Sequence, residues 1–317
     1  MLSEKMGEIK RRMIMMKNVN IGFIGLGNMG NPMARLLVQH GYRVYGHDID
    51  PNAIRTFDCF GGIPAPLTEL FENVNIIILM LPNSQVVNQV IEEIISCLGN
   101  ELTDRNFTII DMSSSYPLET QRNAHKLAQL GIAFLDAPVS GGVKKAATGE
   151  LTIMVGGNRE VFDKHRELFA VLGKQVFYVG PSGSGHLVKM LNNFLSAAHL
   201  LATCEAVHTL SAFGVDPQTG ICIFNHSTGS SISTKYKFPE FILPQTFASG
   251  FSLGLLAKDV SMTKQLLRDR GIDTPLSNLL SEIYGGAACA LGKEADHTEI
   301  FRFVAKFFDE ERKNSNM

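Results

Sequence analysis

The sequence predicts an α/β fold, in which a Rossmann-type doubly wound parallel sheet is followed by an all-α domain joined through a long helix. A glycine-rich turn, Gly25-x-Gly27-x-x-Gly30, separates an apolar run from a helical pattern near the start of the chain. Apolar runs then alternate with helical patterns up to about residue 180, and beyond it only helical patterns follow. Alternation of this kind is typical of parallel sheets covered by helices.

The first strand begins at Val19 and leads directly into the glycine turn, and a helix is expected from Met29 to Val38. Gly25 permits the tight turn, Gly27 lets the backbone approach a pyrophosphate, and Gly30 brings the helix close to the strand. The unpaired N–H groups and the dipole at the helix N-terminus favour an anion there. Strand, turn and helix in this order indicate a dinucleotide site.

An acidic residue supports this interpretation. A second strand is predicted over Gly41–Tyr45, and Asp48 follows it, about 20 residues beyond the glycines, where a ribose hydroxyl is expected. A carboxylate at this position accepts hydrogen bonds from the ribose and repels a 2′-phosphate. NAD is therefore favoured over NADP.

The later strands of the sheet are predicted from apolar runs that end in turn-forming residues. These runs are Asn75–Leu81, Phe107–Asp111, Gly131–Asp136, Leu151–Val155 and Val176–Val179. Helices are expected at Pro51–Phe60, from Ser84 to about Cys97, from about Pro117, and at Arg159–Leu172. Ligands bind beyond the carboxyl ends of such strands. Leu81–Pro82, Ser113–Ser114 and Ala137–Pro138 should therefore line one rim of the sheet.

The helical part begins after the turn Pro181–Gly185. A long helix is predicted over His186–Phe213 and acts as a spine, with shorter ones at Pro217–Asn225, Leu255–Arg270, Pro275–Leu291 and Thr298–Phe308. The expected organisation is a disordered, dispensable leader at residues 1–18, an NAD-binding domain at 19–181, and a helical substrate and dimerisation domain at 182–317.

Composition excludes several classes of protein. The hydrophobic share is 45%, the charged share is 19% and the net charge is −2, which gives no electrostatic indication of a nucleic-acid or membrane partner. Five scattered cysteines lack metal-site spacing and suit the thiols of a reducing compartment. A cytoplasmic location and the absence of a metal site are expected.

Three segments carry residues with catalytic or binding chemistry. Asp136–Gly142 ends a strand in a glycine-rich loop, which is either an anion nest or a simple tight turn. Lys189 lies four residues before Asn193 and therefore on the same face of an otherwise apolar helix. This lysine either extends to solvent or is held in a cleft, where burial readily shifts the pKa of a lysine. Lys258–Asp259 is either functional or a surface ion pair.

These motifs together resemble a known family. They are Phe23–Ala34, Met80–Asn83, Asp111–Ser114, Asp136–Gly142, Gly183-x-Gly185-x-x-x-Lys189-x-x-Asn192-Asn193 and Lys258–Asp259. In this order they are similar to the motifs of the β-hydroxyacid dehydrogenases, within the 6-phosphogluconate dehydrogenase superfamily, and the resemblance runs from about Val19 to about Phe308. Two positions depart from the family pattern, since Leu36 replaces Asn or His and Ser114 replaces the commoner Thr.

The resemblance implies roles for individual residues. Lys189 matches the catalytic lysine. The substrate-binding positions are Ser114, Ser140, Gly141, Gly142, Asn193, Phe251 and Asp259. The cofactor-binding positions are Gly25, Leu26, Gly27, Asn28, Met29, Gly30, Asp48, Ile49, Leu81, Pro82, Ser114 and Lys258. NADP users of the family tend to have Arg near Ile49, which again favours NAD.

The implied reaction is hydride transfer between a nicotinamide and a short 3-hydroxy carboxylic acid or its semialdehyde, as in 3-hydroxyisobutyrate dehydrogenase, with Lys189 as general acid or base. L-threonate dehydrogenase and tartronate or succinic semialdehyde reductase activity remain open, and a homodimer or homotetramer is implied. Imine reductases and non-catalytic scaffolds share the architecture but commonly lack the lysine, and 6-phosphogluconate dehydrogenases carry a longer helical region.

Overall fold

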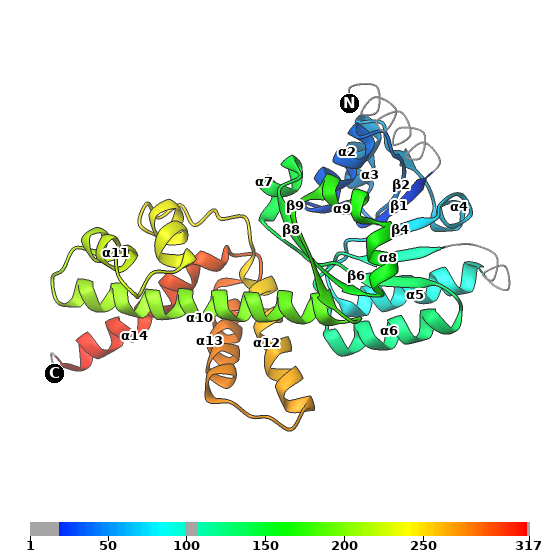
Figure 1. Ribbon diagram of the computed structural model, residues 1–317. Helices are drawn as coiled ribbons and strands as arrows, with labels where there is room; N and C mark the ends of the chain where they lie inside the picture. Colours follow the sequence, from blue (N-terminus) through cyan, green and yellow to red (C-terminus); the bar gives the residue numbers. More distant parts are fainter. Residues whose placement is uncertain (1–18, 99–106, 316–317) are drawn as a thin grey trace, which may run out of the picture. The chain divides into compact units, whose positions relative to one another are not determined.

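A computed structural model describes residues 19–98 and 107–315, so the predicted leader at residues 1–18 lies outside the described residues. The described chain divides into two compact units, one ending at Lys189 and the other beginning at Met190 (Figure 1). This division falls inside the long helix α10, whereas the sequence analysis placed the domain boundary before that helix.

The first unit is built on one mostly parallel sheet, which confirms the predicted fold class. Within the described residues it has nine strands, in the order β3-β2-β1-β4-β5-β6-β8-β7 with β9 beside β8. Their bounds are β1 Asn20–Ile24, β2 Arg43–His47, β3 Ile63–Pro64, β4 Ile76–Leu79, β5 Thr108–Asp111, β6 Ala133–Asp136, β7 Val139–Ser140, β8 Leu151–Gly157 and β9 Gly173–Gly180. Strand β8 runs antiparallel to β6 and β7. An apolar run indicates a buried strand but not its direction, so the sequence could not reveal this reversal.

Helices cover both faces of the sheet and create two apolar cores. One face is covered by α2 Gly30–Gln39, α3 Pro51–Cys59, α7 Gly142–Thr148, α8 Arg159–Lys164 and α9 Arg166–Leu172. The other face is covered by α4 Leu67–Asn73, α5 Ser84–Leu98 and α6 Pro117–Gln129. The helix predicted over Arg159–Leu172 is interrupted at His165. Elements α4, α7 and β3 were not predicted, because segments of seven residues or fewer show little periodicity.

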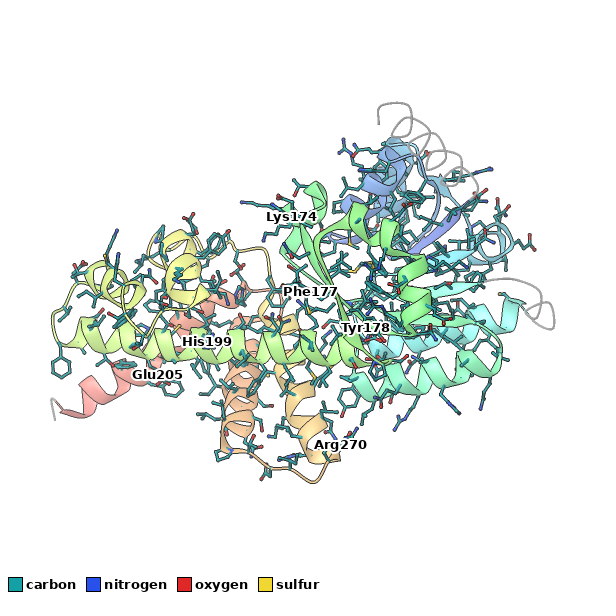
Figure 2. All side chains as sticks on the ribbon, viewed as in Figure 1. Lys174, Phe177, Tyr178, His199, Glu205 and Arg270 are labelled. Carbon is teal, nitrogen blue, oxygen red and sulfur yellow. The ribbon has the colours of Figure 1, made fainter. Side chains whose placement is uncertain are left out.

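The second unit is helical in its described part, as expected. Helix α10 spans Ser184–Ala212 and begins in the first unit; α11 Pro217–Asn225, α12 Leu253–Asp269, α13 Pro275–Leu291 and α14 Ile300–Ser315 follow. The apolar core gathers residues of α10, α12, α13 and α14. His199 and Glu205 project from the exposed side of α10 (Figure 2).

Two irregular helices complete this unit, the 3₁₀ turn η3 at His297–Glu299 and a π-helix, η2, at Ser233–Ile242. Long π-helices are rare and tend to occur at functional sites. Among the described residues, no helix is long and apolar enough to cross a membrane.

Candidate functional site

The predicted rim lies at the carboxyl ends of five strands. Strand register places His47, Ile24, Leu79, Asp111 and Asp136 in one row across the sheet. The loops after β1, β4, β5 and β6 therefore leave the sheet at one edge. The strand order reverses between β1 and β4, and this switch point is where ligands bind in doubly wound sheets.

The glycine turn after β1 has the geometry that a dinucleotide requires. Gly25 has φ +96°, which favours glycine. A Cβ on Gly30 would lie 1.9 Å from the Gly25 carbonyl oxygen, so only glycine permits this close packing. A Cβ on Gly27 would meet nothing within 4 Å, so this position borders open space. Helix α2 starts after Met29 without a side-chain cap, which leaves its N-terminus suited to a pyrophosphate.

Asp48 is tied to this turn by its carboxylate. Its Oδ2 accepts a hydrogen bond from the Leu26 N–H at 2.6 Å, and its Oδ1 accepts one from Asp50 at 2.8 Å. The Leu26 side chain is fully buried, whereas Asn28 is exposed and Ile49 is 96% exposed. Only the backbone of Leu26 thus lies at the turn.

The loops after β4 and β5 are held together by Asp111, which is 1% exposed. Its Oδ1 accepts from the Ser113 N–H at 3.0 Å, and its Oδ2 accepts from Ser115 Oγ at 2.9 Å. Ser113 Oγ in turn accepts from the Leu81 N–H at 2.9 Å. Ser114, between the two bonded serines, is half-buried at the rim.

Asp136, at the end of β6, receives the beginning of helix α10. Its fully buried carboxylate accepts from the Gly183 N–H at 2.8 Å and from the His186 N–H at 3.0 Å. A Cβ on Gly185 would lie 2.3 Å from the Met154 carbonyl oxygen, so this approach needs glycine. A negative charge at a helix N-terminus is also favourable. The strand end is thereby joined to the first turn of the helix that carries Lys189.

His186 adds a second connection that the sequence analysis missed. Its Nδ1 lies 2.8 Å from Thr120 Oγ1 and its Nε2 lies 3.1 Å from the Ser113 carbonyl oxygen, which must accept from it. The side chain is 1% exposed. A single histidine within a helical pattern carries no signal of such partners, because both lie far away in the sequence.

The glycine-rich loop after β6 runs along the same rim. Ser140 ends the short strand β7, which pairs with β8, and Gly141 and Gly142 have φ +140° and +70°. Both glycines are exposed, and a Cβ on Gly142 would meet nothing within 4 Å. The loop is therefore a glycine-specified turn whose backbone is open to a ligand.

Lys189 is half-buried on α10, and Asn193 follows one turn later, buried. Asn193 Nδ2 donates to Asp259 Oδ2 at 2.5 Å. Because a carboxylate only accepts, it fixes which end of the amide faces it. Asp259 is 2% exposed and also lies 3.6 Å from Lys258 Nζ, so the surface ion pair considered for Lys258–Asp259 does not describe this carboxylate.

Phe251 lies at the entrance to α12 and is half-buried. Its ring centroid is 5.4 Å from that of His297, and its carbonyl oxygen accepts from the His297 N–H at 2.9 Å. The second unit thus gathers Asn193, Phe251, Lys258 and Asp259, while the other predicted site residues lie in the first unit. The described residues contain no group of three or more His, Cys, Asp or Glu side chains that could hold a metal ion.

Comparison with known proteins identifies the family. Residues 20–180 match the family model of the NAD-binding domain of 6-phosphogluconate dehydrogenase. Residues 183–304 match the model described as the NAD-binding domain of NADP-dependent 3-hydroxyisobutyrate dehydrogenase. Both matches agree with the division between sheet and helices described above.

Individual relatives cover nearly the whole chain. It is 35% identical to 2-(hydroxymethyl)glutarate dehydrogenase of Eubacterium barkeri, over 88% of this chain and 93% of the relative. It is 34% identical to human mitochondrial 3-hydroxyisobutyrate dehydrogenase, over 90% of this chain and 86% of the relative. A solved structure of Mycobacterium tuberculosis 3-hydroxyisobutyrate dehydrogenase with L-serine superposes with a TM-score of 0.84 at 27% identity, covering 90% of this chain and 99% of that one.

Family models over both units and relatives above 30% identity agree with the resemblance that the motifs indicated. They also show an NAD(P)-dependent enzyme that acts on a hydroxyl group. The chain belongs to the β-hydroxyacid dehydrogenases of the 3-hydroxyisobutyrate dehydrogenase type.

Proposed function

We propose that this hydroxyacid dehydrogenase interconverts a short 3-hydroxy carboxylic acid and its semialdehyde, with Lys189 as the catalytic acid or base. The observation that carries the proposal is the pair Lys189 and Asn193, one turn apart on α10. The helix start is anchored by Asp136, and Asn193 is oriented by Asp259. A general acid or base needs this kind of fixed geometry.

The proposed division of labour follows from the chemistry of each group. The glycine loop with Ser140 holds the substrate carboxylate, and Asn193 holds the hydroxyl group beside Lys189. The Lys189 amine takes the hydroxyl proton during oxidation and returns it during reduction. When bound, the nicotinamide supplies the acceptor or donor of the hydride at the carbinol carbon. Phe251 excludes water from the substrate, and Asp259 acts through Asn193.

We propose NAD as the preferred cofactor. The open Gly27 position, the uncapped start of α2 and the Asp48 carboxylate suit an adenine dinucleotide. Asp48 would repel a 2′-phosphate, and the nearby Arg55 is exposed and hydrogen-bonded to Asn52 instead of facing the turn. Leu81, Pro82, Ser114 and Lys258 remain proposed cofactor contacts. Cytoplasmic location is proposed on the thiol usage alone.

The test measures NADH formation at alkaline pH with 3-hydroxyisobutyrate, 3-hydroxypropionate, 4-hydroxybutyrate, L-threonate and glycerate, for the wild type and Lys189→Ala. One acid should be turned over, and the substitution should lower kcat by about 10²-fold or more, because general acid–base catalysis contributes that much. NAD binding, followed by fluorescence, should be unchanged. Asn192→Ala is the matched control, since Asn192 is exposed on the same helix. Equal kcat for Lys189→Ala and the wild type would remove Lys189 from the mechanism.

A further inference from the structure

Lys237, on the π-helix η2, is a buried cation without an anionic partner. Its side chain is 8% exposed, and its Nζ donates to Ser196 Oγ at 2.8 Å. It makes no ion pair within the part of the chain that the structure describes. Burial lowers the pKa of this amine to about 8, so it remains substantially charged near neutral pH. A buried charge with a single hydrogen bond is costly unless something else compensates it.

The groups nearest to Lys237 do not supply that compensation. The Asp296 carboxylate already accepts from Ser249 Oγ at 2.7 Å and from the Gly250 N–H at 2.9 Å. Burial raises the pKa of the Cys204 thiol, which therefore stays neutral. Burial and the Lys237 charge lower the pKa of His297 to about 3, so this imidazole is neutral too. The lysine thus brings an excess positive charge into the interior.

A second polar group on the same helix is also unsatisfied. Ser233 is fully buried, and its Oγ has no hydrogen-bond partner among the described residues. Because a π-helix closes i→i+5 bonds, residues four apart lie about one turn apart on one face, which places Ser233 and Lys237 together. Buried hydroxyls without partners are uncommon and indicate a missing ligand or water.

The position of these groups relates them to the substrate. Ser196 lies three residues after Asn193 on α10, about 4.5 Å further along the helix axis. The spacing of Lys189, Asn193 and Ser196 places all three on one face of this mainly apolar helix. Lys237 therefore ends at the next polar position beyond the asparagine proposed to hold the substrate hydroxyl.

We propose that Lys237, Ser196 and Ser233 bind a second carboxylate of the substrate, so that the enzyme acts on dicarboxylic 3-hydroxy acids. The Lys237 ammonium supplies the charge, and the hydroxyl protons of Ser196 and Ser233 complete the donor set for the two carboxylate oxygens. This inference rests on the proposed function, because the first carboxylate and the hydroxyl group occupy the site at Lys189 and Asn193.

Among the relatives, the enzyme of Eubacterium barkeri is named for 2-(hydroxymethyl)glutarate, which is a dicarboxylate. This acid carries the same reacting group as 3-hydroxyisobutyrate and replaces the methyl group by a chain that ends in a second carboxylate. The two acids therefore form a matched pair of substrates, which differ at the end of the molecule that Lys237 is proposed to recognise.

The experiment measures kcat and KM for both acids with the wild type, Lys237→Met and Lys235→Met. Lys235 is an exposed neighbour on the same π-helix and serves as the matched control. The wild type should have the higher kcat/KM for the dicarboxylate. Lys237→Met should raise KM for the dicarboxylate by about tenfold or more, the effect of losing a charge-assisted hydrogen bond, with KM for the monocarboxylate nearly unchanged. Lys235→Met should behave as the wild type.

A binding measurement separates this proposal from the proposed function. Glutarate cannot react, and its binding to the full chain saturated with NAD is followed by calorimetry for the wild type and for Ser233→Ala. Binding that Lys237→Met abolishes and Ser233→Ala weakens supports the subsite even if neither acid is oxidised. Turnover of 3-hydroxyisobutyrate without glutarate binding, or equal KM increases for both acids in Lys237→Met, overturns the subsite and leaves the proposed function standing.

Discussion

Single side chains make the stability of the first unit dependent on pH. His165 is 6% exposed, its Nε2 lies 3.1 Å from Thr108 Oγ1, and burial lowers its pKa to about 4. The unfolded chain therefore binds more protons than the folded chain between pH 6.5 and about 4. Stability from this residue is complete above pH 6.5 and is lost as the pH falls through that window.

We expect His165→Gln to reduce this acid sensitivity. The free energy of unfolding of the wild type should fall between pH 6.5 and 4 by up to about 3 kcal/mol more than that of the variant, from 1.36 kcal/mol for each pKa unit. Urea unfolding at several pH values measures the difference. His40→Gln is the control, since His40 is exposed. Parallel pH profiles for His165→Gln and the wild type would show that His165 is not the titrating group.

Ile49 offers a test of cofactor choice at one exposed position. Its side chain is 96% exposed beside Asp48, so an arginine there costs little stability and reaches toward a ribose phosphate. We expect Ile49→Arg to lower KM for NADP by about tenfold through charge-assisted bonds to the phosphate. Ile272→Arg, also at an exposed isoleucine, should leave KM unchanged. An unaltered NADP KM in Ile49→Arg would place the adenine ribose elsewhere.

At the scale of elements, the join between β6 and α10 positions the catalytic helix. The Asp136 carboxylate accepts the Gly183 and His186 N–H groups, one turn before Lys189. An asparagine keeps one acceptor oxygen and faces the second N–H with its own amide hydrogens. One buried N–H group would then lose its partner.

We therefore expect Asp136→Asn to lower the free energy of unfolding by about 2 kcal/mol and to lower kcat as well. Asp216→Asn is a matched control, because Asp216 caps α11 at an exposed position where asparagine is an equally good cap. Thermal unfolding and steady-state kinetics measure both effects. If Asp136→Asn is as stable and active as Asp216→Asn, the join does not position Lys189.

For the whole molecule, α10 displays an apolar row that favours self-association. Val188, Leu191 and Leu195 are 40%, 39% and 53% exposed at spacings of three and four residues, and the same exposed side continues to His199 (Figure 2). Isolated exposed apolar residues are normal, but an aligned row is typical of an interface. We propose a homodimer or homotetramer that uses this row.

Light scattering after gel filtration tests that proposal. The wild type should have the mass of a dimer or tetramer, and the double variant Leu191→Glu, Leu195→Glu should have a smaller mass, because two buried charges would oppose association. Val215→Glu, at another exposed apolar position, should leave the mass unchanged. A monomeric wild type would refute the proposal.

The sequence was most informative where structure is local. The glycine turn and the alternation of strands and helices each depend on residues close in the chain, and both were predicted. The π-helix Ser233–Ile242 and the reversed strand β8 were not, because neither has a distinct residue pattern.

By itself, the sequence thus determined the mostly parallel sheet, the helical second half and the family, since periodicity and ordered motifs are properties of the chain. Only the tertiary structure decided that Asp136 binds the start of α10, that Asp259 orients Asn193 and that Lys237 is buried beside Ser196. The residues in the first two contacts are 47 and 66 positions apart. Such contacts depend on how whole elements pack, and burial then changes the energetic cost of each charge.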